Sequence, residues 1–62
     1  MGRFSTGEIY EGTFPSGNRQ AEVLETSDAG RRARLSFIDN GEPIPEVGWM
    51  ELHQAGKWRK VG

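Results

Sequence analysis

The segment from Arg31 to Asp39 alternates between polar and apolar side chains more regularly than any other part of the chain. Ala33, Leu35 and Phe37 fall on one face of an extended strand, because successive side chains of a strand point to opposite faces. The polar residues between them fall on the other face. Such a strand has one buried side and one solvent-facing side, so the segment directs the chain towards an antiparallel sheet.

Two further strands are predicted before this segment, and short turns join all three. Residues 8–14 (EIYEGTF) and 19–26 (RQAEVLET) are rich in strand-forming residues or alternate in polarity, and residues 1–7 form a lead-in anchored by Phe4. Turn-forming residues follow the three strands at 15–18 (PSGN), 27–30 (SDAG) and 40–41 (NG). Strands joined in this way predict an antiparallel meander.

The last third of the chain has two interpretations. Pro43 and Pro45 exclude a central strand, because proline has no amide hydrogen to give to the sheet. In one interpretation a single helix runs from Pro45 to Ala55, with proline in its first turn. In both interpretations, residues 57–61 form a final strand or a basic extension. The favoured interpretation has a short strand at 44–47, a short helical turn near 48–52, and another short strand from Leu52.

The strand pattern predicts an all-β fold: a small five-stranded antiparallel SH3-like barrel in a single domain spanning residues 1–62. An OB-like barrel is the alternative, but it needs longer strands and more chain. A domain of 62 residues buries only about 60% of its unfolded surface. The chain has no cysteine to add disulfides, so its aromatic residues must supply much of the core: Phe4, Tyr10, Phe14, Phe37, Trp49 and Trp58.

From Gly7 to Leu52 the chain resembles a Tudor domain, one branch of the SH3-like barrels. The matching residues follow the order of the family with nearly its spacing: 7–10 (GEIY), Phe14, Gly17, 21–24 (AEVL), 37–42 (FIDNGE) and 50–52 (MEL). The resemblance implies a small β-barrel that binds another macromolecule without catalysing a reaction.

Tudor domains that bind methylated arginine or lysine hold the cation in a cage of aromatic rings, because a methylated cation is attracted to π faces. The resemblance places the cage positions at Phe14, Arg19, Phe37 and Asn40, with a supporting polar position at Glu42. The cage is incomplete, since Arg19 would repel a cation and Asn40 offers no ring. The sequence therefore predicts that Phe14 and Phe37 belong to the core.

Protein binding is the leading functional prediction. The chain has more apolar surface near its end than a small barrel needs, and tryptophan is a common anchor in protein interfaces. The predicted function is a non-enzymatic binding module, either a protein–protein adaptor or a small oligomer, whose surface lies near the loop 40–48. The predicted protein-binding residues are Trp49, Asn40, Glu42, Phe14 and Met50.

Nucleic-acid binding is the alternative function. Basic residues interleaved with an aromatic residue pair with phosphates and stack on bases. The candidates are Arg32, Arg34, Lys57, Trp58, Arg59 and Lys60. The chain is nearly neutral, with 8 lysine and arginine residues against 9 aspartate and glutamate residues. Cross-strand pairing of these cations with Glu11, Glu22 and Glu25 is favoured over nucleic-acid binding.

Several other functions are not expected. His53 is the only histidine, no serine near it stands in a nucleophile motif, and no cysteine is available to ligate zinc. We therefore predict no catalytic residues, no metal site and no cofactor. Neither a signal peptide nor an apolar run long enough to cross a membrane is present, which predicts a cytoplasmic protein without a membrane partner.

Overall fold

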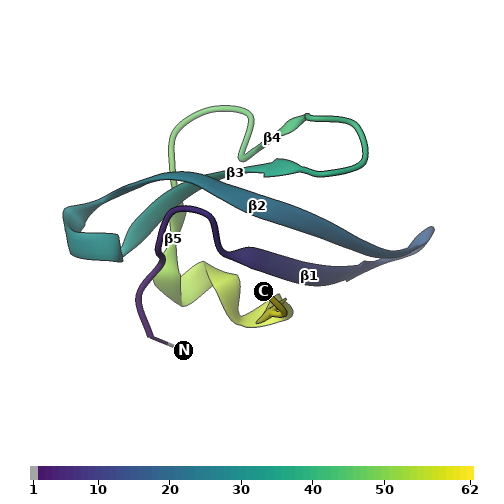
Figure 1. The fold of residues 1–62 in the computed structure, drawn as a ribbon, viewed down its shortest axis with the longest axis horizontal. Helices are drawn as coiled ribbons and strands as arrows, with labels where there is room; N and C mark the ends of the chain where they lie inside the picture. The colour runs from purple at the N-terminus through teal and green to yellow at the C-terminus, as the bar shows by residue number, and fades with distance from the viewer. Residues whose placement is uncertain (1) are drawn as a thin grey trace.

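A computed structural model describes residues 2–62, which form an antiparallel sheet with two short 3-10 helices (Figure 1). The predicted all-β class is therefore confirmed. In chain order, the elements of these residues are β1 (Ile9–Phe14), β2 (Gly17–Ser27), η1 (Asp28–Gly30), β3 (Arg32–Phe37), β4 (Pro43–Ile44), β5 (Met50–Glu51), η2 (Leu52–Lys57) and β6 (Trp58–Lys60).

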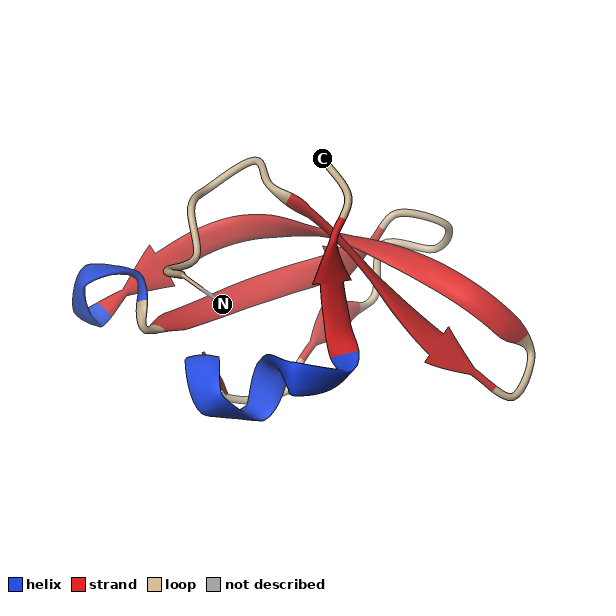
Figure 2. Ribbon diagram, turned by 90° about the horizontal axis from the view of Figure 1, so that it is seen from below, coloured by secondary structure: helices blue, strands red, loops and turns tan. Residues whose placement is uncertain are grey.

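Strands β1, β2 and β3 form an antiparallel meander, and the last strand, β6, pairs with β1. The strand order is β4-β3-β2-β1-β6, and β5 pairs with a different part of β3 from β4. The register places Tyr10 opposite Ala21 and Val23 opposite Leu35, and a bulge follows Val23. The sheet curves, and η2 crosses beneath it (Figure 2). We call the side of the sheet that faces η2 the inner face.

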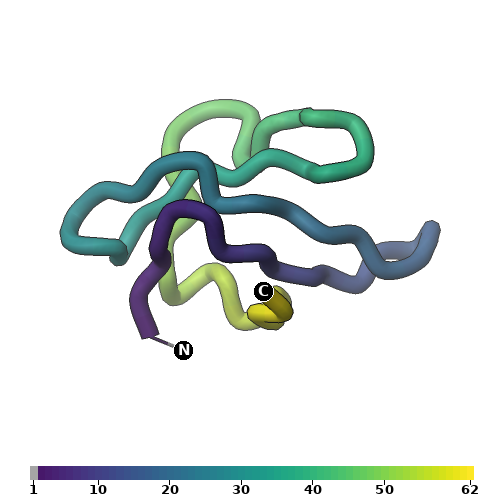
Figure 3. Tube along the Cα trace, in the orientation of Figure 1, coloured from purple at the N-terminus to yellow at the C-terminus, as the bar shows by residue number. Residues whose placement is uncertain are grey.

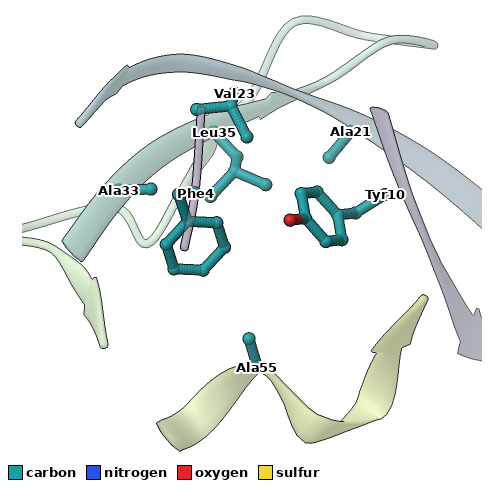
Figure 4. Close-up of a cluster of buried hydrophobic side chains, with 7 residues drawn as sticks. All are labelled: Phe4, Tyr10, Ala21, Val23, Ala33, Leu35 and Ala55. Carbon is teal, nitrogen blue, oxygen red and sulfur yellow. The ribbon is translucent and has the colours of Figure 1, made fainter. Parts of the chain in front are cut away.

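The core lies between the inner face and η2 (Figure 4). The alternation predicted for β3 is confirmed, because Ala33 and Leu35 are both buried. The predicted anchor Phe4 is also buried, and its ring meets Tyr10 edge-on at 5.6 Å between centroids. Within residues 2–62 the buried hydrophobic side chains are Phe4, Tyr10, Ala21, Val23, Ala33, Leu35 and Ala55.

The prediction for the last third was partly wrong. Residues 2–62 contain six strands rather than five, because the two-residue strands β4 and β5 pair separately with β3. The helical turn predicted near residues 48–52 begins only at Leu52 and continues to Lys57, and the alternative helix from Pro45 is replaced by a loop over residues 45–49 (Figure 3). Residues 58–60 form the final strand, as one alternative predicted. Met1, the first residue of the predicted lead-in, lies outside the described residues.

Tyr10 makes the stability of this fold sensitive to alkaline pH. Burial raises the pKa of Tyr10 from 10.0 to about 12, and the hydrogen bond that its hydroxyl donates to Glu8, at 3.1 Å, acts in the same direction. The unfolded chain releases this proton near pH 10, whereas the folded chain keeps it until about pH 12. The folded state therefore binds more protons in this window, and stability falls as the pH rises through it.

We expect the free energy of unfolding to decrease between pH 10 and 12 in the native chain and to decrease less in Tyr10→Phe. Denaturant unfolding at a series of pH values measures this difference, which isolates Tyr10 from the lysines that titrate in the same range. Tyr10 is the only tyrosine of the chain, so tyrosinate absorbance follows its titration directly. Parallel pH profiles for the two proteins would contradict the prediction.

Candidate functional site

Three aromatic side chains extend the inner face of the sheet beyond the buried core. Phe14, Phe37 and Trp58 come from β1, β3 and β6, and all three remain half-buried. The ring centroid of Phe14 lies 5.6 Å from that of Phe37 and 5.6 Å from that of Trp58, both with edge-to-face geometry. The Phe37 and Trp58 centroids are 6.2 Å apart. We call these three residues the aromatic end.

The strand register explains how these rings come together. Phe37 continues the inward alternation of Ala33 and Leu35, while Trp58 lies opposite Gly12 in the pairing of β1 with β6. Gly12 leaves room for the indole, because a Cβ atom at this position would lie 3.0 Å from the Trp58 ring. The missing side chain of Gly12 therefore lets the indole pack closely against β1 next to Phe14.

Arg19 lies over the aromatic end. Its guanidinium carbon is 3.6 Å from the centroid of the Phe37 ring and 5.7 Å from that of Phe14, the geometry of a cation–π contact. Its Nε and Nη2 atoms donate hydrogen bonds to the two carboxylate oxygens of Asp39, at 2.9 and 2.8 Å. Two parallel bonds of this kind fix the plane of the guanidinium.

The loop after β3 supplies the carboxylate that holds Arg19. Hydrogen bonding to the guanidinium holds the pKa of Asp39 below its ordinary value, so this carboxylate stays charged near neutral pH. The amide N–H of Glu42 donates to the Asn40 side chain at 3.0 Å, and its carbonyl accepts from the Phe37 amide at 2.9 Å. The loop thus keeps a compact shape beside the aromatic end.

The predicted protein-binding residues separate into two groups. Phe14 belongs to the aromatic end, and the loop that carries Asn40 and Glu42 borders it. Met50 lies opposite Ala33 at the other end of β3, and Trp49 directly precedes it in the chain. Both are half-buried, and Met50 packs against the core. The structure therefore does not bring Trp49 and Met50 to the aromatic end.

Arg19, Asp39 and Trp58 were missed as parts of this surface. The resemblance placed Arg19 among the cage positions only as a charge that repels a ligand, and Trp58 was assigned to a nucleic-acid surface. The alternation of β2 contained the missing signal, because Arg19 is separated from Ala21 and Val23 by even numbers of residues and so falls on the same face of the strand. No local pattern identifies Asp39 as its partner.

The basic residues predicted for nucleic-acid binding do not form one face. Arg32 and Arg34 lie on β3, which β2 and β1 separate from Arg59 and Lys60 on β6. Trp58 packs into the aromatic end. Four of the cations make ion pairs: Arg32 with Glu51 at 2.9 Å, Arg34 with Glu25 at 3.8 Å, Lys60 with Glu8 at 3.6 Å, and Arg59 with Glu11. Lys57, the sixth candidate, is exposed at the end of η2.

His53 is exposed on η2, at the rim of an open hollow that Asp28, Arg31 and Glu51 also line. Its surroundings combine both signs of charge, and Glu51 is already paired with Arg32. Among residues 2–62, no group of three or more histidine, aspartate or glutamate side chains is arranged to hold a metal ion.

Comparison of the chain with protein-family models, with curated proteins and with solved structures finds no match. In the part of the chain that the structure describes, no helix has the length and apolar character needed to cross a bilayer.

Proposed function

We propose that this chain is a non-enzymatic protein-binding module with an SH3-like, Tudor-like fold, and that its partner contacts the aromatic end. Two features support the SH3-like part of the proposal. The meander of short strands is followed by a last strand that pairs with the first, and the curved sheet surrounds one small core.

The protein-binding part of the proposal rests on the partial exposure of the three rings of the aromatic end. Burying one aromatic side chain contributes roughly 2–3 kcal/mol, which a domain this small needs. Three rings nevertheless remain partly open to solvent at one end of the inner face, outside the cluster of fully buried residues. Clustered aromatic residues with a polar rim are typical of the centre of a protein interface.

Nucleic-acid binding has less support. A protein that coats phosphates needs unpaired cations on one continuous face, because its affinity comes from the counterions that they release. Here the cations of β3 and β6 lie on separate strands, and Arg34 and Arg59 pair with Glu25 and Glu11. The outer side of the sheet thus has alternating charges of both signs, which favours the protein-binding proposal.

A displayed random-peptide library, selected against the immobilised chain, tests this proposal. We expect Phe14→Ala to reduce the affinity of a selected peptide by about tenfold or more, because truncating an anchor in an interface costs about 2 kcal/mol or more. Amide-resolved NMR of the native chain should map the peptide onto Phe14, Phe37 and Trp58.

Leu24→Ala is the matched control, since Leu24 is 52% exposed on β2 and lies outside the aromatic end. It should leave peptide affinity unchanged. Equal losses in both variants, or peptide-induced shifts confined to Trp49 and Met50, would overturn the assignment of the surface. Salt-sensitive binding of a mixed RNA and DNA pool at Arg32 and Arg34, with no peptide enriched, would replace the proposal with the nucleic-acid alternative.

A further inference from the structure

A cation of the chain itself, the Arg19 guanidinium, already lies over the aromatic end. The Arg19 guanidinium lies 3.6 Å from the Phe37 ring centroid, well inside the distance of about 6 Å at which a cation is attracted to a π face. Only 25% of the Arg19 side chain is exposed, although arginine side chains are usually mostly exposed. Arg19 therefore packs onto the aromatic end rather than extending into solvent.

We propose that Arg19, held by Asp39, is a built-in occupant of the aromatic end that excludes external cations, so that this surface does not bind a cationic side chain of a partner. The inference concerns the same surface as the proposed function, and it rests on that function in no other respect. Its test uses a small cation and needs no protein partner, so the two proposals fail independently.

The anchoring of Arg19 supports this inference. An arginine on a flexible stem loses side-chain entropy when it is fixed, so a weak contact alone does not hold it over a ring. Asp39 supplies two hydrogen bonds to one edge of the guanidinium, and Phe37 supplies the π face beneath it. An external cation would have to displace an arginine that is tethered to the same chain, and would meet its positive charge if it bound alongside.

The surroundings of Arg19 show what its removal would expose. Without the guanidinium, the rings of Phe37 and Phe14 would face solvent next to the carboxylate of Asp39, with the carboxylate of Glu42 on the same loop. Aromatic faces beside negative charge attract cations of low hydration. Arg19→Ala should therefore convert a surface closed to cations into a cation site.

NMR titration with tetramethylammonium chloride, against sodium chloride at equal ionic strength, tests this. In the native chain we expect no saturable shifts. In Arg19→Ala we expect saturable shifts at Phe14, Phe37 and Trp58. Arg59→Ala is the matched control, because it removes another paired arginine for which no ring contact is found among residues 2–62.

A second measurement keeps the inference testable if Arg19→Ala fails to fold. In the native chain, the side-chain protons of Arg19 should be shifted upfield by the Phe37 ring, and Asp39→Asn should reduce this shift by loosening the guanidinium. Equal tetramethylammonium binding by the native chain and a folded Arg19→Ala would overturn the inference. So would a folded Arg19→Ala that binds none, or an Arg19 without ring-current shifts.

Discussion

Leu35→Ala is expected to lower the free energy of unfolding by about 3 kcal/mol, which is most of the stability available to a domain of this size. Leu35 is 1% exposed, lies opposite both Val23 and Ile44, and is among the largest of the fully buried side chains. Its truncation leaves a cavity under β3, the strand that pairs with β2, β4 and β5. The small core has few side chains that can move to fill it.

Thermal unfolding followed by circular dichroism measures this effect. A loss of about 3 kcal/mol corresponds to a fall of roughly 10–25 °C in the midpoint for a domain of this length. Leu24→Ala makes the same chemical change at a side chain that is 52% exposed, and it should change stability by less than about 0.5 kcal/mol. A midpoint for Leu35→Ala within a few degrees of the control would show that the core lies elsewhere.

The part of the fold that was predicted correctly is the part with strands long enough to have a period. β2 and β3 contain 11 and 6 residues, so their alternation repeats several times and identifies Ala21, Val23, Ala33 and Leu35 as inward-facing. The turn sequences between the strands then predicted that successive strands pair as a meander. Both the alternation and the turn sequences are local patterns, and local patterns can be recognised in a single sequence.

The last third lacked such signals. β4 and β5 are two residues each, which is too short for any alternation, and their pairing with β3 depends on tertiary contacts. The helical turn was predicted too early, near residues 48–52, and the alternative helix was started at Pro45 because proline is common in the first turn of a helix. The structure instead has a capping box in which Glu51 and Gln54 bond to each other's backbone amides, so that η2 begins at Leu52.

The same distinction applies to the candidate site. Strand alternation is sufficient to place Phe37 and Arg19 on one face, but the pairing of Arg19 with Asp39 joins residues 20 positions apart. The proximity of Trp58 to Phe14 depends on the last strand returning to the first across Gly12. Contacts of this kind join distant parts of the chain, so no single segment of the sequence encodes them.

Gly30→Ala is expected to destabilise the chain by about 3 kcal/mol or more, because it affects both the backbone and the core. Gly30 has a φ of +86° and is buried, and an added Cβ would lie 2.8 Å from the backbone oxygen of Phe4. The Phe4 backbone cannot easily move away from the added Cβ, since its amide donates a 2.8 Å hydrogen bond to the Gly30 carbonyl. We therefore expect the substitution to push the N-terminal segment off the sheet and withdraw the Phe4 ring from Tyr10.

Denaturant unfolding of four variants, Gly30→Ala, Gly48→Ala, Phe4→Ala and the double variant of Gly30 and Phe4, separates these causes. Gly48→Ala has nearly the same backbone conformation, with a φ of +81°, but open space around the new Cβ, so it should lose only the backbone strain of about 1–2 kcal/mol. If Gly30→Ala acts through Phe4, then adding it to Phe4→Ala should cost clearly less than the sum of the two single changes, because both remove the same packing. Full additivity, or a loss in Gly30→Ala no larger than in Gly48→Ala, would show that Gly30→Ala does not act through Phe4.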